Sequence, residues 1–463
     1  MRLQVNVNVS HNRNLFYWLV ESAGDPLNDP LVLWTNGGPG CSSLSGGLFS
    51  EFGPFRPNAD GSLTLTPNPW TWTLHANIIF LEQPAGVGFS WSGDTSDYTT
   101  GDYQSAHDAY QFLLGFTARF PRYAGRELYI SGESYGGHYV PSFAKAIVDG
   151  NAAGGSPQLN IKGFLVGNAW TVAALDNTGA VDYWFSRTMI DDATHDGVLS
   201  TCNMSDVGPL FAKSGALKQK EADWEIATGV ARGSKVRPLG FTPLQDPATG
   251  GAVVKGGLDC DGWTSQAFGL LGSIDIYDSY VDVCTAAASA KRSAAASAAA
   301  APQLGAGSNN NAGCAASYDP CIGDRTTTYL NNVLVKAAIH ANASIEWSGC
   351  SGVVDYSRFD LLSSMLPTYS ALIAAGLRIT VFSGDVDAIV PSVGTRLWLN
   401  AFNRTTITPI RNWGIGDGQV GGWTTQFDGV NFTTIRNAGH FVPETQAERA
   451  LYMFKSFIAN TPL

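Results

Sequence analysis

Apolar residues gather in short continuous runs in both halves of the chain, with polar and turn-forming segments between them. Runs with strand propensity lie at 15–20, 31–35, 78–81, 128–131, 163–168, 378–382 and 432–436, and residues 1–5 lead into a strand-like alternation. Helical spacing is found at 102–120 and 329–341. Strands without a polar face are typical of a parallel sheet that helices cover on both sides. The pattern therefore predicts an α/β fold.

The middle of the chain interrupts this pattern. Residues 171–320 show little alternation of strand and helix, and 285–313 are rich in Ala, Ser, Gly and Asn. This composition favours a disordered surface loop, with a continuous alanine helix as the alternative. We expect a sheet domain in two parts, 1–170 and 321–463, into which 171–320 is inserted as a cap subdomain.

Composition excludes several classes of partner. Charged residues make up 14% of the chain, against roughly 25% in an average soluble protein. The formal net charge is −11 and no long basic run occurs, so nucleic acid and anionic membranes are not expected partners. No apolar run is long enough to span a bilayer. No Cys or His cluster has the spacing of a zinc site, and we expect neither a metal nor an organic cofactor.

Cysteines and glycosylation sequons indicate a compartment in which disulfides form. The chain has seven cysteines, and N-x-S/T sequons occur at Asn8, Asn203, Asn342, Asn403 and Asn431. A single sequon arises by chance, but together with the cysteines they favour the secretory pathway. No signal peptide is visible after Met1, and we expect the native N-terminus to be missing or trimmed.

One segment carries a candidate nucleophile. The strand-like run 128–131 is followed by Gly-Glu-Ser134-Tyr-Gly and then by a helix-compatible run. This is the G-x-S-x-G pattern of a nucleophile elbow in its strand–turn–helix setting, where the flanking glycines permit a sharp turn. The alternative is a chance match, because the chain contains 52 glycines.

Two later strands end at residues that complete a Ser–Asp–His order. The run 378–382 leads into Ser-Gly-Asp385-Val-Asp387, and the run 432–436 leads into Asn-Ala-Gly-His440. A serine nucleophile needs a base for its proton, and the base needs an acid that fixes its tautomer. Asp385 and Asp387 both fit the Ser–Asp–His order along the chain. His138, four residues beyond the serine, is interpreted as structural.

Several blocks of the sequence carry a resemblance to a known family. WTNGGPGCSS (34–43), GESYGGHY (132–139), GDVDAIVP (384–391) and NAGHFVPETQ (437–446) resemble those of the serine carboxypeptidase family, as do NIIFLEQPAGVGFS (77–90) and FLVGNAW (164–170). The likeness extends from about Asn6 over nearly the whole chain, except the middle insertion. It implies an α/β-hydrolase fold, with a mostly parallel central sheet and a cap.

The resemblance implies a role for each member of the triad. Ser134 would be the nucleophile, His440 the general base and acid, and Asp387 the residue that orients the histidine. The family pattern selects Asp387 over Asp385.

The same match implies two further binding elements. An oxyanion hole would consist of the backbone N–H groups of Gly38 and Tyr135, in agreement with the general rule for hydrolases. The C-terminal carboxylate of the substrate would bind to Asn36, the Gly37 backbone, Glu51 and Glu133. Glu51 and Glu133 would have to share protons in order to donate hydrogen bonds to that carboxylate. The loop from Asn36 to Glu51 is one residue longer than in some members, which makes Glu51 the less secure of the two glutamates.

The family pattern also implies a specificity pocket and three disulfides. Val390 and Phe441 would line the pocket for the residue before the scissile bond and would favour an apolar side chain there. The implied pairs are Cys41–Cys350, Cys202–Cys260 and Cys284–Cys321. Cys314 is then left over, free or intermolecular. Several relatives are cut inside the region that corresponds to 285–313, so excision of this segment is compatible with the resemblance.

The activity implied is that of a serine-type carboxypeptidase, which releases single C-terminal residues at acidic pH through an acyl-enzyme. An acyltransferase that uses sugar esters is the alternative; such relatives often carry Asp in place of the elbow glutamate, so Asn36 and Glu133 favour the peptidase. A stabilising partner subunit is a third interpretation, against which the complete triad argues. Expected partners are peptide or protein C-termini, with a homodimer left open. The expected location is the vacuole, the lysosome or the extracellular space.

Overall fold

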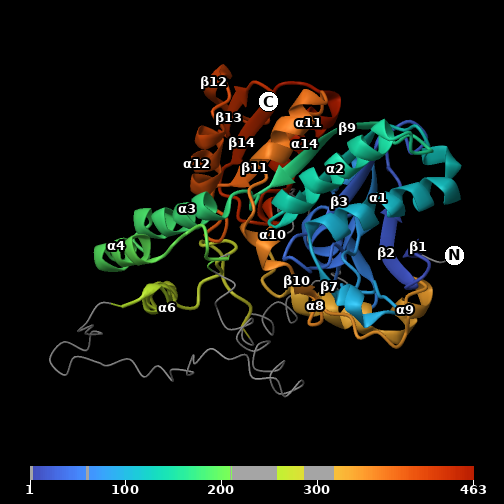
Figure 1. Ribbon diagram of the computed structural model, residues 1–463, viewed down its shortest axis with the longest axis horizontal. Helices are drawn as coiled ribbons and strands as arrows, with labels where there is room; N and C mark the ends of the chain where they lie inside the picture. Colours follow the sequence, from blue (N-terminus) through green and yellow to red (C-terminus); the bar gives the residue numbers. More distant parts are fainter. Residues whose placement is uncertain (1–3, 59–61, 209, 211–257, 286–317) are drawn as a thin grey trace, which may run out of the picture.

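A ten-stranded sheet forms the centre of the molecule (Figure 1). The computed structural model describes residues 4–58, 62–208, 210, 258–285 and 318–463. In spatial order the strands are β1 (Gln4–Asn8), β2 (Arg13–Val20), β6 (Asn77–Leu81), β3 (Leu31–Thr35), β8 (Leu128–Glu133), β9 (Ile161–Gly167), β11 (Arg378–Gly384), β14 (Val430–Ile435), β13 (Gly422–Phe427) and β12 (Thr406–Trp413). The strands from β6 to β14 are parallel, and those at both edges are antiparallel. The predicted central strands are therefore confirmed.

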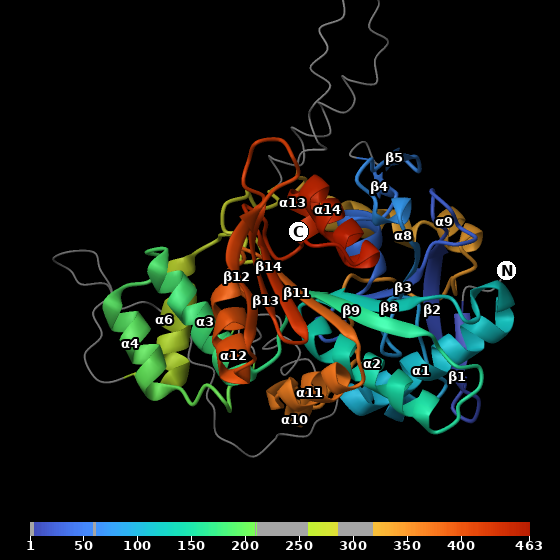
Figure 2. The ribbon, with the colours of Figure 1, turned by 90° about the horizontal axis from the view of Figure 1, so that it is seen from above.

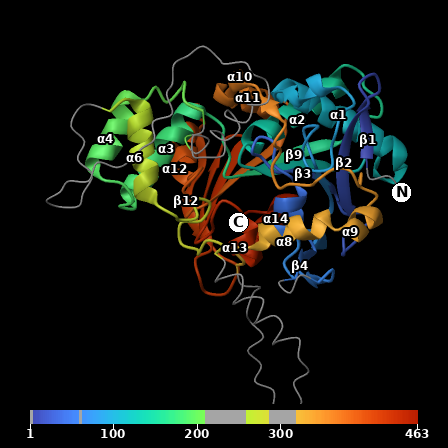
Figure 3. The same ribbon diagram turned by 90° about the horizontal axis from the view of Figure 1, so that it is seen from below.

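Helices cover both faces of the sheet, as Figures 2 and 3 show from opposite sides. One face packs against α1 (Asp102–Arg119), α2 (Gly136–Ala152), α11 (Leu366–Ala374) and α12 (Ser392–Phe402). The other face packs against the helical segment η1 (Leu44–Glu51), α8 (Ile322–Asn331), α9 (Val333–Ala338), α13 (Val442–Thr445) and α14 (Ala447–Ala459). Strands β3, β6 and β8 are buried along their whole length, which explains their continuous apolar sequence.

The remaining elements are short or lie beside the sheet. They are α10 (Arg358–Leu362), the strand pairs β4 (Phe55–Pro57) with β5 (Leu65–Pro67) and β7 (Thr99–Thr100) with β10 (Asp355–Tyr356), and the helical turns η2 (Trp72–Leu74), η3 (Thr95–Tyr98) and η4 (Pro121–Tyr123). Helices α3 (Ala173–Ser186), α4 (Asp192–Thr201) and α6 (Cys260–Leu271) extend to one side of the molecule (Figure 1). These three helices belong to the predicted insertion, and α3 packs against α12. Residues 286–313 and Cys314 lie outside the described residues.

Two helix predictions can be compared with the structure. Helix α1 matches the run 102–120: its buried residues Ala109, Phe112 and Phe116 recur at helical spacing, and Asp102 and Arg119 complement the helix dipole. The single helix expected at 329–341 is instead divided between α8 and α9. Asn332 separates them, because its side chain accepts the Leu334 N–H at 2.9 Å and caps the second helix.

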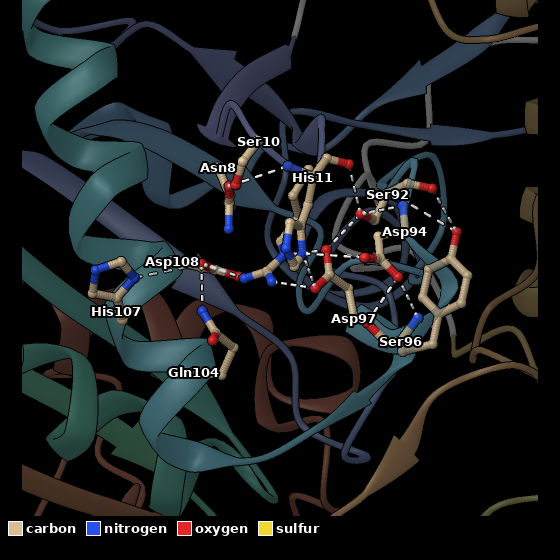
Figure 4. Close-up of polar contacts among 12 residues, drawn as sticks. Asn8, Ser10, His11, Ser92, Asp94, Ser96, Asp97, Gln104, His107 and Asp108 are labelled. Atoms are coloured by element: carbon tan, nitrogen blue, oxygen red, sulfur yellow. Dashed lines mark hydrogen bonds and ion pairs between the residues drawn. The ribbon is translucent and has the colours of Figure 1, made fainter.

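A buried ion cluster joins the N-terminal strands to α1 (Figure 4). Arg13 is 4% exposed. Its Nε donates to Asp97 Oδ2 at 2.8 Å, and its Nη1 donates to Asp108 Oδ1 and Oδ2 at 2.9 and 2.8 Å. His11 Nδ1 lies 2.9 Å from Asp97 Oδ1 at the edge of this cluster. One guanidinium group therefore serves two buried carboxylates from different segments.

Removal of Arg13 is expected to destabilise the fold strongly. Arg13→Ala leaves Asp97 and Asp108 buried without their cation, a change that costs about 3–5 kcal/mol. Lys145→Ala is the control, because Lys145 and Asp149 form a solvent-exposed pair worth about 0.3–0.5 kcal/mol. Denaturant unfolding of both variants measures the difference. A loss for Arg13→Ala no larger than that of the control would contradict this interpretation.

Candidate active site

The candidate site lies at the carboxyl edge of the parallel strands. Asn36 follows β3, Ser134 follows β8, and Asn168 follows β9, while the loops after β11 and β14 carry Asp387 and His440. These five strands are consecutive neighbours in the sheet. Parallel strands end at one edge, and open α/β sheets bind ligands beyond that edge. The topology therefore brings together polar groups that are distant in the sequence.

Ser134 lies on a strained turn between β8 and α2. Its φ is +60°, a conformation that is unfavourable for a residue other than glycine. The Ser134 N–H donates to Gly167 O at 3.0 Å, and Ser134 O accepts from Trp170 N at 2.9 Å. The residue is half-buried, while both of its sequence neighbours are buried. The segment after β9 thus holds the turn that places the serine hydroxyl at the end of its strand.

The glycines around Ser134 have a different role from the one expected. The positive φ belongs to Ser134 itself and not to Gly132 or Gly136. A Cβ on Gly132 would lie 2.3 Å from a carbonyl oxygen of β3, and one on Gly137 would lie 2.1 Å from Trp170 O. A Cβ on Gly136 would meet nothing closer than 3.6 Å. Close approach of neighbouring backbone therefore requires glycine at 132 and 137, and the turn itself does not.

The second aspartate after β11 contacts His440. His440 Nδ1 lies 2.8 Å from Asp387 Oδ2, and the two side chains are 1% and 0% exposed. Asp387 Oδ2 also accepts from Asn168 Nδ2 at 2.7 Å, and Asp387 Oδ1 accepts from Ile389 N at 2.8 Å. Asp385 Oδ1 instead accepts a backbone N–H from the loop after β14 at 2.6 Å. Several donors therefore hold the Asp387 carboxylate in one orientation toward the imidazole.

The other ring nitrogen of His440 is buried next to a cavity. His440 lines this cavity, and its Nε2 has no hydrogen-bond partner among the described residues, Ser134 included. A bond between base and nucleophile is often long before substrate binds. Tyr277 holds the loop in place: its carbonyl accepts the His440 N–H at 2.6 Å, and its ring packs 5.3 Å from the imidazole. The histidine is thus fixed on one side and free to accept a proton on the other.

Asn36 joins the two glutamates that were expected to lie together. Asn36 Nδ2 donates to Glu133 Oε1 at 2.5 Å and to Glu51 Oε1 at 3.2 Å. Its own Oδ1 accepts from Trp34 Nε1 at 2.6 Å and from Gly47 N at 3.1 Å, which fixes the direction of the amide. Glu51 is 1% exposed and Glu133 is 2% exposed. The longer loop therefore still brings Glu51 to Glu133.

The two glutamates keep their protons at a higher pH than an ordinary carboxyl group does. Burial raises the pKa of Glu51 to about 7, although hydrogen bonds with Glu133 and Asn36 oppose the change. Burial, the charge of Glu51 and the hydrogen bond with Glu51 raise the pKa of Glu133 well above its ordinary value. A hydrogen bond between two carboxyl groups requires a proton on one of them. At acidic pH this pair can therefore donate hydrogen bonds to an anion.

The glycine loop after β3 meets the start of α2. A Cβ on Gly37 would lie 2.3 Å from Tyr135 N, so this position admits only glycine. Gly38 has a φ of +110°, which also favours glycine. The first N–H groups of a helix lack an intrahelical acceptor and form its positive end. Backbone donors from Gly38 and Tyr135 thus belong to segments that adjoin Ser134.

His138 lies on α2 and belongs to a network separate from Asp387 and His440. Its Nδ1 lies 2.8 Å from Asp102 Oδ2, and its ring stacks on that of Tyr135 with centroids 4.7 Å apart. Asp102 Oδ1 accepts from Tyr135 Oη at 3.0 Å and from Tyr356 Oη at 2.7 Å. These contacts agree with a structural role for His138.

Comparison with known proteins identifies the family. Residues 4–460 match the family model described as serine carboxypeptidase. The chain belongs to the serine carboxypeptidase family. It is 39% identical over 465 residues to "Serine carboxypeptidase 24" and 38% identical over 468 residues to "Serine carboxypeptidase-like 25", both from Arabidopsis thaliana. Each alignment covers 99% of this chain and 88% of the relative.

The solved structures show the fold of this family member. The crystal structure of Kex1ΔP, a prohormone-processing carboxypeptidase from Saccharomyces cerevisiae, matches with a TM-score of 0.71 at 19% identity and covers 99% of this chain and 90% of that one. The fold is that of the α/β-hydrolases, as expected. None of the helices described here combines the length and apolar character needed to cross a bilayer.

The cysteines of this serine carboxypeptidase family member form three disulfides within the described residues. Cys41 is bonded to Cys350, Cys202 to Cys260, and Cys284 to Cys321, the pairs implied by the resemblance. The first joins the glycine loop to the second half of the chain. The sequon residues Asn203, Asn342 and Asn403 are exposed, and Asn8 and Asn431 are half-buried. Their glycosylation stays a prediction.

The two residues expected to line the specificity pocket differ in their relation to the cavity next to His440. Phe441 lines the cavity next to His440, with its ring stacked 5.3 Å from that of Tyr277. Val390 is 1% exposed and does not line that cavity. Sequence reasoning assigned no role to Asn168 or Tyr277, which contact Asp387 and His440. The position of Asn168 at the end of a predicted strand was a usable signal, whereas Tyr277 lay in a segment without a recognisable pattern.

Proposed function

We propose that the protein is a serine-type carboxypeptidase that removes single residues from the C-termini of peptides. The observation that supports this most is that Asn36 donates to two buried glutamates, Glu51 and Glu133, of which Glu133 directly precedes Ser134 in the chain. An esterase needs a nucleophile and a base. An enzyme that acts on free C-termini also needs a group that binds the terminal carboxylate of the substrate, and Glu133 lies one residue from the nucleophile.

In this proposal Ser134 attacks the last peptide carbonyl of the substrate. His440 Nε2 accepts the serine proton and transfers it to the leaving amine, while Asp387 stabilises the imidazolium and fixes its tautomer. An acyl-enzyme remains on Ser134, and water then attacks it with His440 again as base. The N–H groups of Gly38 and Tyr135 would stabilise the oxyanion, with added support from the positive end of α2.

The carboxylate site gives this enzyme an acidic preference. At low pH, Glu51 and Glu133 hold protons and donate to the C-terminal carboxylate together with Asn36 and the Gly37 backbone. As pH rises past about 7, the pair loses a proton and like charges begin to repel. Binding then weakens, although His440 becomes a better base when neutral.

KM for a free-acid peptide is expected to rise by about tenfold per pH unit once the pair loses its proton. A C-terminal amide has no charge to repel, so its KM should stay nearly constant from about pH 4 to about pH 8. Glu133→Gln should flatten the rise for free acids and lower affinity at low pH. Steady-state kinetics on matched acid and amide substrates measure these effects.

Glu82→Gln provides the control for this pH dependence. Burial also raises the pKa of Glu82 to about 7, but Glu82 bonds to Ser42, Phe89 and Trp347 outside the carboxylate site. Its replacement should leave the steep rise in KM intact. Equal KM profiles for acid and amide substrates would contradict the shared-proton account.

A competition assay tests the proposed activity against its alternatives. A blocked dipeptide with Phe or Leu before the scissile bond, the apolar preference proposed for the pocket of Val390 and Phe441, should release its C-terminal amino acid. An acyl-glucose donor with an alcohol should give little transfer. Dominant transfer would favour an acyltransferase, and absence of both reactions would favour a stabilising subunit. The three disulfides support a location in the secretory pathway, with vacuole, lysosome and extracellular space all included.

A further inference from the structure

A cavity of about 440 Å³ lies between strands β11 to β14 and helix α14. Figure 2 shows this helix beside the four strands. The strands contribute four threonines, two arginines, one asparagine and one glutamine to the lining of the cavity. Its volume falls within the range of about 300–1,000 Å³ that is usual for ligand pockets. This cavity is separate from the one next to His440, with which it shares no lining residue.

The part of the sheet that forms the cavity floor is polar. Further along the same strands and on the same face, Phe382 and Ile435 belong to the apolar core that includes Phe454 of α14. Thr380 and Thr433 are 6% and 1% exposed, so threonines replace large apolar side chains at the floor. A hydroxyl group can both donate and accept a hydrogen bond. The floor therefore suits a ligand that carries hydroxyl and amide groups.

The charges around the cavity favour a neutral ligand. Arg378 Nη1 donates to Phe457 O at 2.5 Å and to Ile458 O at 3.3 Å, so this arginine caps the C-terminal end of α14. Arg411 lies at the exposed rim. No aspartate or glutamate of the described residues lines the cavity, which leaves a cation without a counter-charge. A polar, uncharged group such as a sugar matches this lining best.

Asn431 lies at the centre of the polar floor. In the sheet register it pairs with Thr380 of β11 on one side and with Gln426 of β13 on the other. Side chains at paired positions lie about 5 Å apart on one face of the sheet. Asn431 is half-buried, and its side chain has no hydrogen bond with any residue that the structure describes. It is also the first residue of the sequon Asn431-Phe-Thr433.

Other sequons of the chain have a different local structure. Asn342 Oδ1 accepts from Ser344 N at 3.1 Å and from Ser344 Oγ at 2.8 Å, and Asn203 Oδ1 accepts from Ser205 N at 3.3 Å. These are turns on the surface, and both asparagines are exposed. A sugar attached there would project into solvent. A sugar attached to Asn431 would instead enter the cavity.

We infer that Asn431 carries an N-linked glycan and that the cavity holds its first sugar, an N-acetylglucosamine. The donor is an oligosaccharide linked to a lipid diphosphate. Asn431 Nδ2 forms a bond with the anomeric carbon of this sugar, the bond from that carbon to the diphosphate oxygen breaks, and the amide nitrogen gives one proton to water. The transfer precedes folding of β14, because Thr433 of the sequon is buried in the sheet. The inference is independent of the proposed peptidase function.

The neighbours of Asn431 can hold the sugar in place. Gln426 Oε1 accepts from Thr408 Oγ1 at 3.1 Å, which leaves the NH₂ group of Gln426 available to a sugar oxygen. Phe457 of α14 lines the cavity and supplies an apolar surface for the sugar ring. Gln426 and Arg411 are exposed, so the rest of the glycan can leave through the rim. The bond between Asn431 and the first sugar is therefore shielded while the outer sugars are not.

The test measures how fast a peptide amidase removes glycans from the folded protein, secreted by a eukaryotic host. The amidase cleaves between asparagine and the first sugar and leaves aspartate, so peptide masses after reaction in heavy-oxygen water report each site separately. Removal at Asn431 should be at least about 100-fold slower than at the exposed Asn342, because the amidase must wait for local opening. After denaturation, both sites should be cleaved at the same rate.

Two threonine variants test the cavity itself. Thr380→Val removes a hydroxyl group beside Asn431 and should speed removal at Asn431 by about 2- to 10-fold. Thr425→Val is the matched control, because Thr425 lies on the adjacent strand β13 and does not line the cavity. Equal acceleration by both variants would overturn the inference. So would an unmodified Asn431 in a protein that is glycosylated at Asn342, or equal rates at the two sites in the folded protein.

Discussion

Ser134→Ala should give a folded protein whose peptidase turnover is roughly 10⁴- to 10⁶-fold lower than that of the parent. The reason is that Ser134 alone combines the strained turn, the end of β8 and the adjacent helix N-terminus. The variant should also fail to react with a fluorophosphonate probe, which labels an activated serine. Both effects are measured by steady-state kinetics and by intact mass after labelling.

Ser142→Ala is a suitable control for this experiment. Ser142 lies on α2, the helix that follows Ser134, and is half-buried. It should keep both turnover and labelling, with a melting temperature close to that of Ser134→Ala. Labelling at another serine, with Ser134→Ala still active, would show that the nucleophile has been assigned incorrectly.

Asp387→Asn should reduce kcat by about 10⁴-fold with little change in fold. Asp387 accepts from Asn168 and from the backbone of Ile389 while it contacts His440 Nδ1. An amide in its place must direct an NH₂ group at one of these donors or at the imidazole. The histidine then loses the acceptor that fixes its reactive tautomer. Kinetics and a calorimetric melt on the same preparation separate the catalytic effect from the structural one.

The adjacent aspartate provides the comparison for Asp387→Asn. Asp385 accepts one backbone N–H from the loop after β14, and an asparagine oxygen can accept the same bond. Asp385→Asn should therefore cost less than about tenfold in kcat. A larger loss for Asp385→Asn than for Asp387→Asn would transfer the orienting role to Asp385.

The positions of the three proposed triad residues were predictable, because each follows a strand whose apolar sequence is recognisable by itself. Ser134, Asp387 and His440 all occupy such positions, and parallel strands bring their ends together. The choice between Asp385 and Asp387 was different: the residues alone left it open, and only the resemblance selected one. Here the structure adds the contact with His440.

Other features depend on packing between distant segments and had no local signal. Tyr277 and Asp278 reach the active site because the chain after α6 packs on the loop after β14. Glu444 lies on a four-residue helix, and its burial follows from its neighbours and not from its own sequence. The edge strand β12 is mostly exposed, so it lacks the continuous apolar run by which the central strands were found.

The most direct test of the account is a time course of peptide mass at acidic pH. A peptide with a free C-terminus should lose one residue at a time from that end, and the matching peptide amide should show a different pH dependence. Ser134→Ala should produce no loss under the same conditions. Internal cleavage, release from the N-terminus, or unchanged C-terminal release by Ser134→Ala would contradict the account.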